Sequence, residues 1–175
     1  MLKKNRFATL FFPAVFLWAI NFCLPDMVFA APPLYKASII IQGVGLDINN
    51  EGQVVGSYTM NSLTQAFVWD KKEGLKDLGF AQDGYSARAR AINDLGQIIG
   101  EYWNSTTRPI IYIWEEKSGY QKIDGLTDAV AINNNGIIVG SVRVPGDIFS
   151  VIWKPGEGIR YLTNNGRGMD INDHN

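Results

Sequence analysis

The sequence predicts an all-β protein built as an array of four-stranded units, and three recurring blocks carry that prediction. The first block, I-N-x-x-G-x-[IV]-[IV]-G, occurs at residues 48–56, 92–100 and 132–140, and a further copy opens at 171–173. A tryptophan follows the last glycine of each complete copy by 13, 14 and 13 residues, and a glycine-led block ending in Leu or Ile comes next. The copies are 44, 40 and 39 residues apart, a period typical of propeller blades.

The tryptophan blocks predict strands that are buried on both faces. Residues 66–69, 111–114 and 150–153 read A-F-V-W, I-Y-I-W and S-V-I-W, whereas a strand with one face in water alternates apolar with polar residues. Other sheets must therefore cover these strands on both sides, as when one sheet packs between two others. Blades stacked around an axis meet that requirement.

The I-N-x-x-G block predicts a tight connection between strands. Asn at the first position of a type I turn bonds to its own backbone, and Gly at the fourth position takes a positive φ. We expect the three tryptophans to be equivalent and largely buried. The positions with a structural role in the repeat are Asn49, Gly52, Gly56, Trp69, Asn93, Gly96, Gly100, Trp114, Asn133, Gly136, Gly140 and Trp153.

Small residues stand three places before each isoleucine, at Gly45, Ala89, Ala129 and Gly168. They imply close approach of backbones, so the segment before each turn is predicted as the inner strand. The blades then run from about 43–79, 86–125 and 127–163, with an incomplete fourth unit at 166–175. Residues 35–41 are expected to form an outer strand that closes the ring. The predicted fold is a partial, open β-propeller of about three blades plus a fragment, with at least nine strands.

The combined motif resembles the HAF family of probable extracellular repeats. That family takes its name from a His-Ala-Phe triplet ahead of the tryptophan, and the first copy here has Gln65-Ala66-Phe67. The second and third copies, Ile110-Ile111-Tyr112 and Phe149-Ser150-Val151, depart further. The resemblance covers residues 43–175 and implies a repeat domain over 31–175 that acts outside the cell. It implies no particular biochemical activity.

Residues 1–30 read as a secretory signal peptide. A basic start at residues 3–6 precedes a mostly apolar stretch at 7–22, and Val28-Phe29-Ala30 suits a signal peptidase. The alternative is a retained membrane anchor, but Pro13 and Pro25 interrupt the run and it is short for a span. We therefore expect cleavage after Ala30, no stable membrane span afterwards, and a secreted or periplasmic location.

Cleavage would also change composition and charge. It removes the only cysteine, Cys23, so neither a disulfide nor thiol chemistry is expected. It removes three basic groups and one acidic group, which takes the formal net charge from −1 to −3. That mild acidity gives no reason to expect nucleic-acid binding.

Catalytic, cofactor and metal sites are not predicted. The only histidine is His174, which argues against a Ser-His-Asp triad or a His-rich metal site. Residues 47–52, D-I-N-N-E-G, match the first half of a calcium loop, but Tyr58 stands where a bidentate Glu is expected. The same segment forms the turn in copies that carry Ala91 or Ala131 in place of Asp47. We therefore interpret it as a turn.

The variable segments between the first two strands of each unit are the predicted recognition site. They span residues 57–65, 101–109 and 141–147, and loops on a rigid scaffold often carry function. The candidate contact residues are Tyr58, Tyr102, Trp103 and Arg108. The Tyr102-Trp103 pair suits stacking on a sugar ring or anchoring of a partner protein. Alternatively, Trp103 continues its strand and packs on a neighbouring blade.

These observations predict an exported, non-catalytic interaction module whose partner is a carbohydrate or a surface protein. One alternative is a propeller hydrolase that acts on glycans with carboxylates near the axis. Another is a truncated fragment with no independent function. Because three units leave the end strands unpaired, we also expect self-association through the open blade edges.

Overall fold

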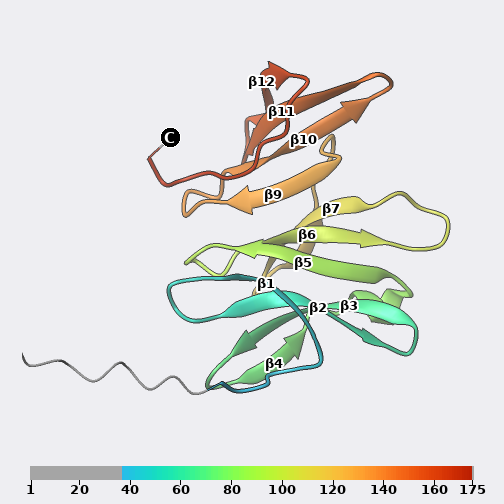
Figure 1. Ribbon diagram of the computed structural model, residues 1–175, viewed down its shortest axis with the longest axis vertical. Helices are drawn as coiled ribbons and strands as arrows, with labels where there is room; N and C mark the ends of the chain where they lie inside the picture. Colours follow the sequence, from blue (N-terminus) through green and yellow to red (C-terminus); the bar gives the residue numbers. More distant parts are fainter. Residues whose placement is uncertain (1–36, 175) are drawn as a thin grey trace, which may run out of the picture. The chain divides into compact units, whose positions relative to one another are not determined.

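The computed structural model describes residues 37–174, drawn in colour in Figure 1. Every element below belongs to one compact unit, which begins at Ser38. The predicted signal peptide and the first residues of the predicted outer strand lie outside the described residues. Between residues 37 and 174, no helix is long and apolar enough to cross a bilayer.

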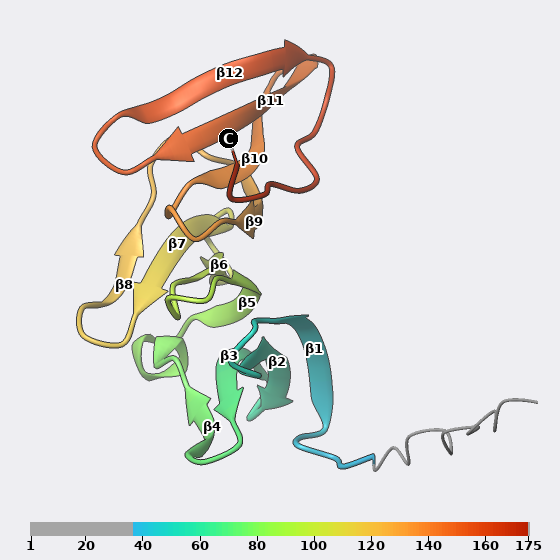
Figure 2. The same cartoon turned by 90° about the vertical axis from the view of Figure 1, so that its left-hand side faces the viewer.

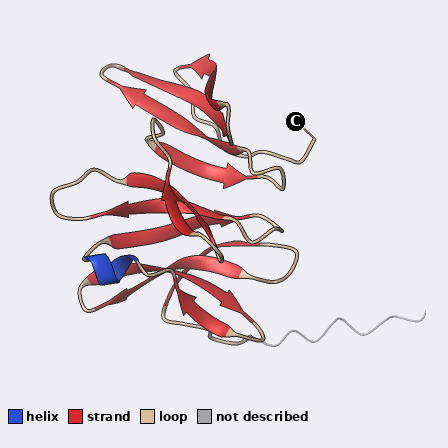
Figure 3. Cartoon of the chain, turned by 180° about the vertical axis from the view of Figure 1, so that it is seen from behind, coloured by secondary structure: helices blue, strands red, loops and turns tan. Residues whose placement is uncertain are grey.

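The all-β prediction is confirmed: this unit holds twelve strands in three four-stranded antiparallel sheets. The one helix of the described part is the short 3-10 turn η1 (Phe80–Asp83), blue in Figure 3. Each sheet uses four consecutive strands, so the chain completes one sheet before it begins the next. Sheet 1 holds β1 (Gly43–Ile48), β2 (Val54–Met60), β3 (Leu63–Asp70) and β4 (Gly74–Asp77). Sheet 2 holds β5 (Ser86–Ile92), β6 (Ile98–Trp103), β7 (Ile110–Glu115) and β8 (Gly119–Lys122). Sheet 3 holds β9 (Asp128–Ile132), β10 (Ile138–Val144), β11 (Asp147–Lys154) and β12 (Gly158–Asn164).

The I-N-x-x-G block forms the connection between the first two strands of every sheet. In sheet 1 the backbone N–H of Gly52 donates to the carbonyl of Asn49 over 3.0 Å. The side-chain oxygen of Asn49 accepts from the backbone N–H of Gln53 over 2.9 Å. The turn glycines Gly52, Gly96 and Gly136 have φ of 79°, 77° and 73°, values at which a Cβ is strained. The turn geometry therefore accounts for both the Asn and the Gly of the I-N-x-x-G block.

The last glycine of each block lies at a close approach between the first two strands. A Cβ on Gly56, Gly100 or Gly140 would lie 1.9, 2.0 or 2.1 Å from the carbonyl oxygen of Val44, Arg88 or Asp128. The register shifts at the same point in all three sheets, which marks a β-bulge. The bulge brings one strand's carbonyl over the glycine of the other.

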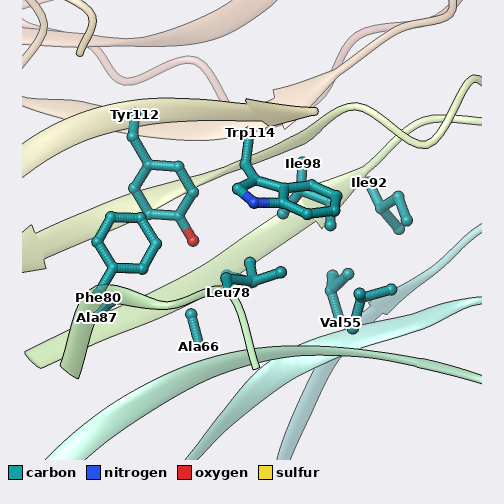
Figure 4. Close-up of a cluster of buried hydrophobic side chains, with 11 residues drawn as sticks. Val55, Ala66, Leu78, Phe80, Ala87, Ile92, Ile98, Tyr112 and Trp114 are labelled. Atoms are coloured by element: carbon teal, nitrogen blue, oxygen red, sulfur yellow. The ribbon is translucent and has the colours of Figure 1, made fainter. Parts of the chain in front are cut away.

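Hydrophobic packing between successive sheets forms the core. In Figure 4, Val55, Ala66 and Leu78 of the first repeat face Ile98 and Trp114 of the second. A second cluster joins sheets 2 and 3; its buried residues are aliphatic, whereas the first cluster also contains buried aromatic rings. A third, smaller cluster consists of Ile137, Val139 and Ile152 on the far face of sheet 3, with Ile171 packed on it. Every sheet thus packs on the repeat that follows it.

The tryptophans are equivalent in position but not in burial. Trp69, Trp114 and Trp153 pair with Val54, Ile98 and Ile138, which are matching positions of the three sheets. Trp114 is 6% exposed, whereas Trp69 and Trp153 are only partly buried. All three are therefore largely buried, as predicted, but only Trp114 is fully enclosed. Trp69 lies on the first sheet, where no earlier sheet covers it in the described part.

Two predicted strands are not formed. Residues 37–41, the described part of the predicted outer strand, pair with no sheet, and Ile39 is 95% exposed. Residues 166–171 were expected as an inner strand, yet they are irregular. A strand needs a neighbour that pairs with it along its length. The first segment has none, and the second makes a backbone bond from Gly166 to Ile148 without continuing it as a ladder. The three sheets do not close on themselves.

Candidate functional site

A ladder of asparagine side chains joins the repeats along their turns. The side-chain amide of Asn49 donates to the carbonyl of Asn93 over 3.1 Å, and Asn93 donates to the carbonyl of Asn133 over 2.9 Å. Asn133 donates in turn to the carbonyl of Asn172 over 3.0 Å. The side-chain oxygen of each of these residues also accepts a backbone N–H of its own turn. The same asparagine therefore stabilises its turn and links it to the next repeat.

A second row of contacts runs beside the first, one residue further along the chain. Asp94 accepts from the backbone N–H of Asn50 over 2.9 Å and from its side-chain amide over 2.8 Å. Asn134 donates to Asp94 over 3.0 Å and to Asp173 over 3.0 Å. The backbone N–H of Asn50 lowers the pKa of Asp94, helped by the amides of Asn134 and Asn50. This carboxylate therefore stays ionised and holds the rungs together.

The turns of all four copies line one polar hollow of about 340 Å³. Its wall consists of the isoleucine, the asparagine and the following Asn or Asp of each copy, together with His174. Both carboxylates at this wall, Asp94 and Asp173, accept hydrogen bonds from the ladder. Among the described residues, no group of three or more His, Cys, Asp or Glu side chains is placed to hold a metal ion.

The carboxylate of Asp47, which the sequence offered as a calcium ligand, accepts two backbone hydrogen bonds in the structure. One oxygen accepts from the backbone N–H of Ile48 and the other from the backbone N–H of Ile92, both over 2.9 Å. The second bond crosses from sheet 1 to sheet 2, so Asp47 links two repeats. This role matches the interpretation of residues 47–52 as a turn.

A groove of about 440 Å³ runs between sheets 1 and 2 at the turn end. Val68, Ile98 and Trp114 give it an apolar floor, and Glu115, Glu116 and Lys117 contribute polar walls. Leu95 at its rim is 70% exposed. The carboxylates are already partnered: Glu115 accepts from the amide of Gln97 over 2.7 Å, and Glu116 pairs with Lys76. The groove therefore offers an apolar floor beside carboxylates that already have partners.

An aromatic cluster occupies the same inter-sheet junction around Phe80. The ring of Phe80 stacks on Tyr120 with centroids 4.4 Å apart and on Tyr102 at 5.3 Å. Tyr112 lies 4.5 Å from Phe80, and Tyr85 meets Tyr102 edge to face at 5.3 Å. Phe80 and Tyr112 are buried, whereas Tyr85, Tyr102 and Tyr120 are partly exposed. The cluster thus presents several ring surfaces above a fixed base.

The tyrosine hydroxyls of this cluster are held in the neutral form. Tyr112 donates to the carbonyl of Arg88 over 3.1 Å, and burial raises its pKa well above the ordinary value. Tyr120 donates to Asp83 over 2.9 Å, and that bond, followed by burial, raises the pKa of Tyr120. Burial also raises the pKa of Tyr102. At neutral pH these groups are hydrogen-bond donors rather than bases.

The four predicted contact residues fall into different settings. Tyr58 in β2 donates to Asp77 of its own sheet over 3.0 Å, and burial raises its pKa. Tyr102 and Trp103 end β6, and both are partly exposed. Arg108 is exposed in the segment between β6 and β7. Only Tyr102 belongs to the aromatic cluster, so the structure divides the predicted site.

Four members of the cluster were not predicted as site residues: Phe80, Tyr85, Tyr112 and Tyr120. Tyr112 and Tyr120 stand inside repeat blocks, and their positions were interpreted as purely structural. Phe80 begins η1 and Tyr85 follows it, both in the connection between sheets 1 and 2. The sequence did hold one signal for them. Phe80 and Tyr85 are two aromatic residues close together in a connection, and connections are otherwise mostly polar.

The segment after β6 is shaped by Asn104. Its side-chain oxygen accepts from the backbone N–H groups of Thr106 and Thr107 and from the hydroxyl of Thr106, each over 2.9 Å. These bonds fix a local turn just beyond Trp103.

Comparison of the chain with protein-family models, with curated proteins and with solved structures finds no match.

Proposed function

We propose that residues 38–174 are a sector of a β-propeller-like array that works as an exported, non-catalytic binding module for carbohydrate. The observation that carries the proposal is the aromatic cluster in which Tyr85, Tyr102 and Tyr120 remain partly exposed above buried Phe80 and Tyr112. Tyrosine suits such a surface because its ring is apolar and its hydroxyl is polar.

The propeller-like arrangement draws support from the repeated packing of four-stranded sheets. Sheet 2 packs on sheet 1 with one face and on sheet 3 with the other, as in blades around an axis. The asparagine ladder follows the inner strands β1, β5 and β9 in order. We further propose that the chain belongs with the HAF-type extracellular repeats, on the motif given above.

The cluster offers what a sugar ring needs. The C–H faces of a pyranose pack on exposed aromatic rings, and its hydroxyls need nearby donors and acceptors. Asp83 and Lys122 supply such groups: Asp83 bonds to Tyr120, and Lys122 pairs with Asp124 over 2.6 Å. Tyr112 anchors the base by its bond to Arg88. The rings are thus held in place before any ligand arrives.

Hydrolysis of glycans finds less support than binding. A general acid in such an enzyme needs a carboxyl group whose pKa is raised. Asp94, at the hollow lined by the turns, has its pKa lowered instead by three donated hydrogen bonds. A carboxylate held in this way cannot supply a proton near neutral pH.

The binding proposal is tested by calorimetric titration with cello-, chito- and xylo-oligosaccharides. We expect at least one series to bind, and we expect Tyr120→Ala to weaken that binding by about tenfold, the effect of losing one stacking ring. Trp103→Ala tests the neighbouring ring. Tyr161→Ala is the matched control, because Tyr161 is a 58% exposed tyrosine on sheet 3, away from the cluster.

The outcomes separate clearly. Equal affinity in wild type and Tyr120→Ala would remove the cluster from consideration. A lack of binding across all three series would leave a surface protein as the partner to be sought. Export is tested separately by amino-terminal sequencing of the protein recovered outside the cytoplasm, where a start at residue 31 is expected.

A further inference from the structure

The two internal interfaces use equivalent positions, which defines two faces for every sheet. The head face carries the tryptophan and its partner, for example Trp114 and Ile98 in sheet 2. The tail face carries the next pair along the same strands, Val55 and Val68 in sheet 1. The tail face of sheet 1 packs on the head face of sheet 2. Sheets 2 and 3 repeat that arrangement.

The head face of sheet 1 exposes a residue that is buried at both internal interfaces. Ile48 is 62% exposed, whereas Ile92 and Ile132, its equivalents in the second and third repeats, are 5% and 8% exposed. The residue type is the same at all three positions. The difference therefore lies in the neighbour, since sheet 1 has no preceding sheet in the described part.

The tail face of sheet 3 shows the same contrast at its outer half. Leu162 is 46% exposed, while Leu78 and Ile123, at the same position of the sequence repeat, are 5% and 4% exposed. In sheet 3 the register shifts at this point, so Leu162 lies unpaired between Tyr161 and Thr163. The inner half is covered by the segment after β12, which returns past β10 toward β9 in Figure 2. Gly168 and Ile171 supply this cover.

Exposed large apolar side chains gather at these two ends of the array. In the described part of the chain, Leu95 is the one that sheet 2 contributes. The others belong to sheet 1 and the residues before it, or to sheet 3 and the residues after it, at opposite ends of the stack in Figure 1. They are Ile39, Ile40, Val44, Leu46, Ile48, Met60, Leu75, Val144, Tyr161, Leu162 and Met169.

We propose that a second copy of this chain covers these ends, with the head face of its sheet 1 on the tail face of sheet 3 of the first copy. The interface continues one that the chain already makes twice within itself. Most of its repeat positions carry apolar residues again, although Ser150 stands where sheets 1 and 2 have Ala66 and Ile111. Such a head-to-tail contact is heterologous, so it adds copies until a ring closes or a filament grows.

The turn ladder continues across the same contact. Within a single chain, Asn133 donates to the carbonyl of Asn172, and the backbone N–H of Asn134 donates to Asp173 over 2.7 Å. In the assembly these donors meet the carbonyl of Asn49 and the side-chain oxygen of Asn50 of the second copy. Those two residues hold the corresponding positions of the first repeat.

The segment that covers the inner half of the tail face is displaced in this assembly. Residues 166–174 form no strand; they contact sheet 3 at both ends and through Ile171. The backbone N–H of Gly166 donates to the carbonyl of Ile148 over 3.1 Å, and Asn172 and Asp173 bond to the ladder. Sheet 1 of the second copy would cover the whole tail face of sheet 3, in place of the few contacts that residues 166–174 make there. The inference uses only the packing of the sheets and does not depend on carbohydrate binding.

The test mixes two variants of the full chain, each purified with the amino terminus that the host leaves. Ile48→Asp disables the head face and keeps the tail face, whereas Leu162→Asp does the reverse. Both positions are exposed, so neither change needs the core to adapt. Light scattering across a concentration series should show wild type forming larger assemblies, each variant alone remaining monomeric, and the mixture forming a one-to-one dimer.

Two controls keep the result interpretable. Leu95→Asp changes an exposed leucine on sheet 2, and it should associate as wild type does. Thermal melting verifies that each variant is folded, and Ile48→Lys with Leu162→Lys replaces any pair that is not. A monomeric wild type, or a single variant that associates as well as wild type, would overturn the proposal. Loss of sugar binding alone would leave it untouched.

Discussion

The side-chain amide of Asn93 donates to the carbonyl oxygen of Asn133, 40 residues further along the chain, over 2.9 Å. Both residues are almost completely buried. The same amide donates to Gln97 over 2.7 Å, and its oxygen accepts from the backbone N–H of Gln97 over 2.9 Å. One side chain thus closes its own turn and fastens sheet 2 to sheet 3.

Replacing the Asn93 side chain should therefore lower the free energy of unfolding by more than the loss of a surface hydrogen bond does. We expect Asn93→Ala to lower the free energy of unfolding by about 1–3 kcal/mol, because it leaves the buried carbonyl of Asn133 and the turn N–H groups without this partner. Urea denaturation measures the change. Asn50→Ala, at an exposed position of the neighbouring row, should cost clearly less; equal losses would mean that burial does not set the strength of the ladder.

Gly100 should not tolerate a side chain. A Cβ there would lie 2.0 Å from the carbonyl oxygen of Arg88 and 2.6 Å from the hydroxyl of Tyr112. We expect Gly100→Ala to destabilise the fold by about 1–3 kcal/mol, the usual cost of overpacking. Gly45→Ala is the control, since its Cβ would meet Val54 at an ordinary 3.5 Å. A mild effect at Gly100 in the same denaturation assay would show that the bulge can open.

Acid should weaken the turn ladder through Asp94. Its pKa is lowered in the folded state by donated hydrogen bonds, so the bound, ionised form favours folding above the unfolded pKa. That contribution is lost as pH falls through the folded pKa, below about pH 4. Melting temperatures of wild type should therefore fall more steeply in this range than those of Asp94→Asn. Parallel curves for the two proteins would exclude this linkage.

Alkali should act on the aromatic cluster through Tyr112. Burial raises the pKa of its hydroxyl well above the ordinary value, so folding keeps this group neutral. The stabilisation is complete below the unfolded pKa of about 10 and declines as pH rises from there toward the folded pKa. In a spectrophotometric titration, Tyr112 should ionise only with unfolding. Tyr112→Phe should remove that late step and leave the earlier tyrosine ionisations unchanged.

Local turn chemistry explains why much of the fold could be predicted from the sequence. The I-N-x-x-G copies fix where strands end, and the spacing to Trp69, Trp114 and Trp153 fixes which strands correspond. The unequal burial of those tryptophans could not be derived in the same way. It depends on whether another sheet lies against each one, and the sequence of a repeat is nearly the same whether it has a neighbour or not.

The candidate site was predicted only in part for a related reason. Tyr102 was nominated because it stands outside the repeat pattern, whereas Tyr112 and Tyr120 stand inside it. The cluster joins both kinds of position, since Phe80 in the connection between sheets inserts between them. The contact is made across a sheet boundary, which no spacing along one strand reveals.

The ladder also bears on how the molecule comes apart and how such arrays change in length. Each rung bonds only to the rung beside it, so the coupling between repeats is nearest-neighbour and one-dimensional. Unfolding therefore starts at a terminal repeat and moves inward, and sheet 2, flanked on both sides, exchanges its amide hydrogens last. Duplication of a segment of about 40 residues inserts one more rung without altering any other, which makes repeat number an easy quantity for evolution to vary.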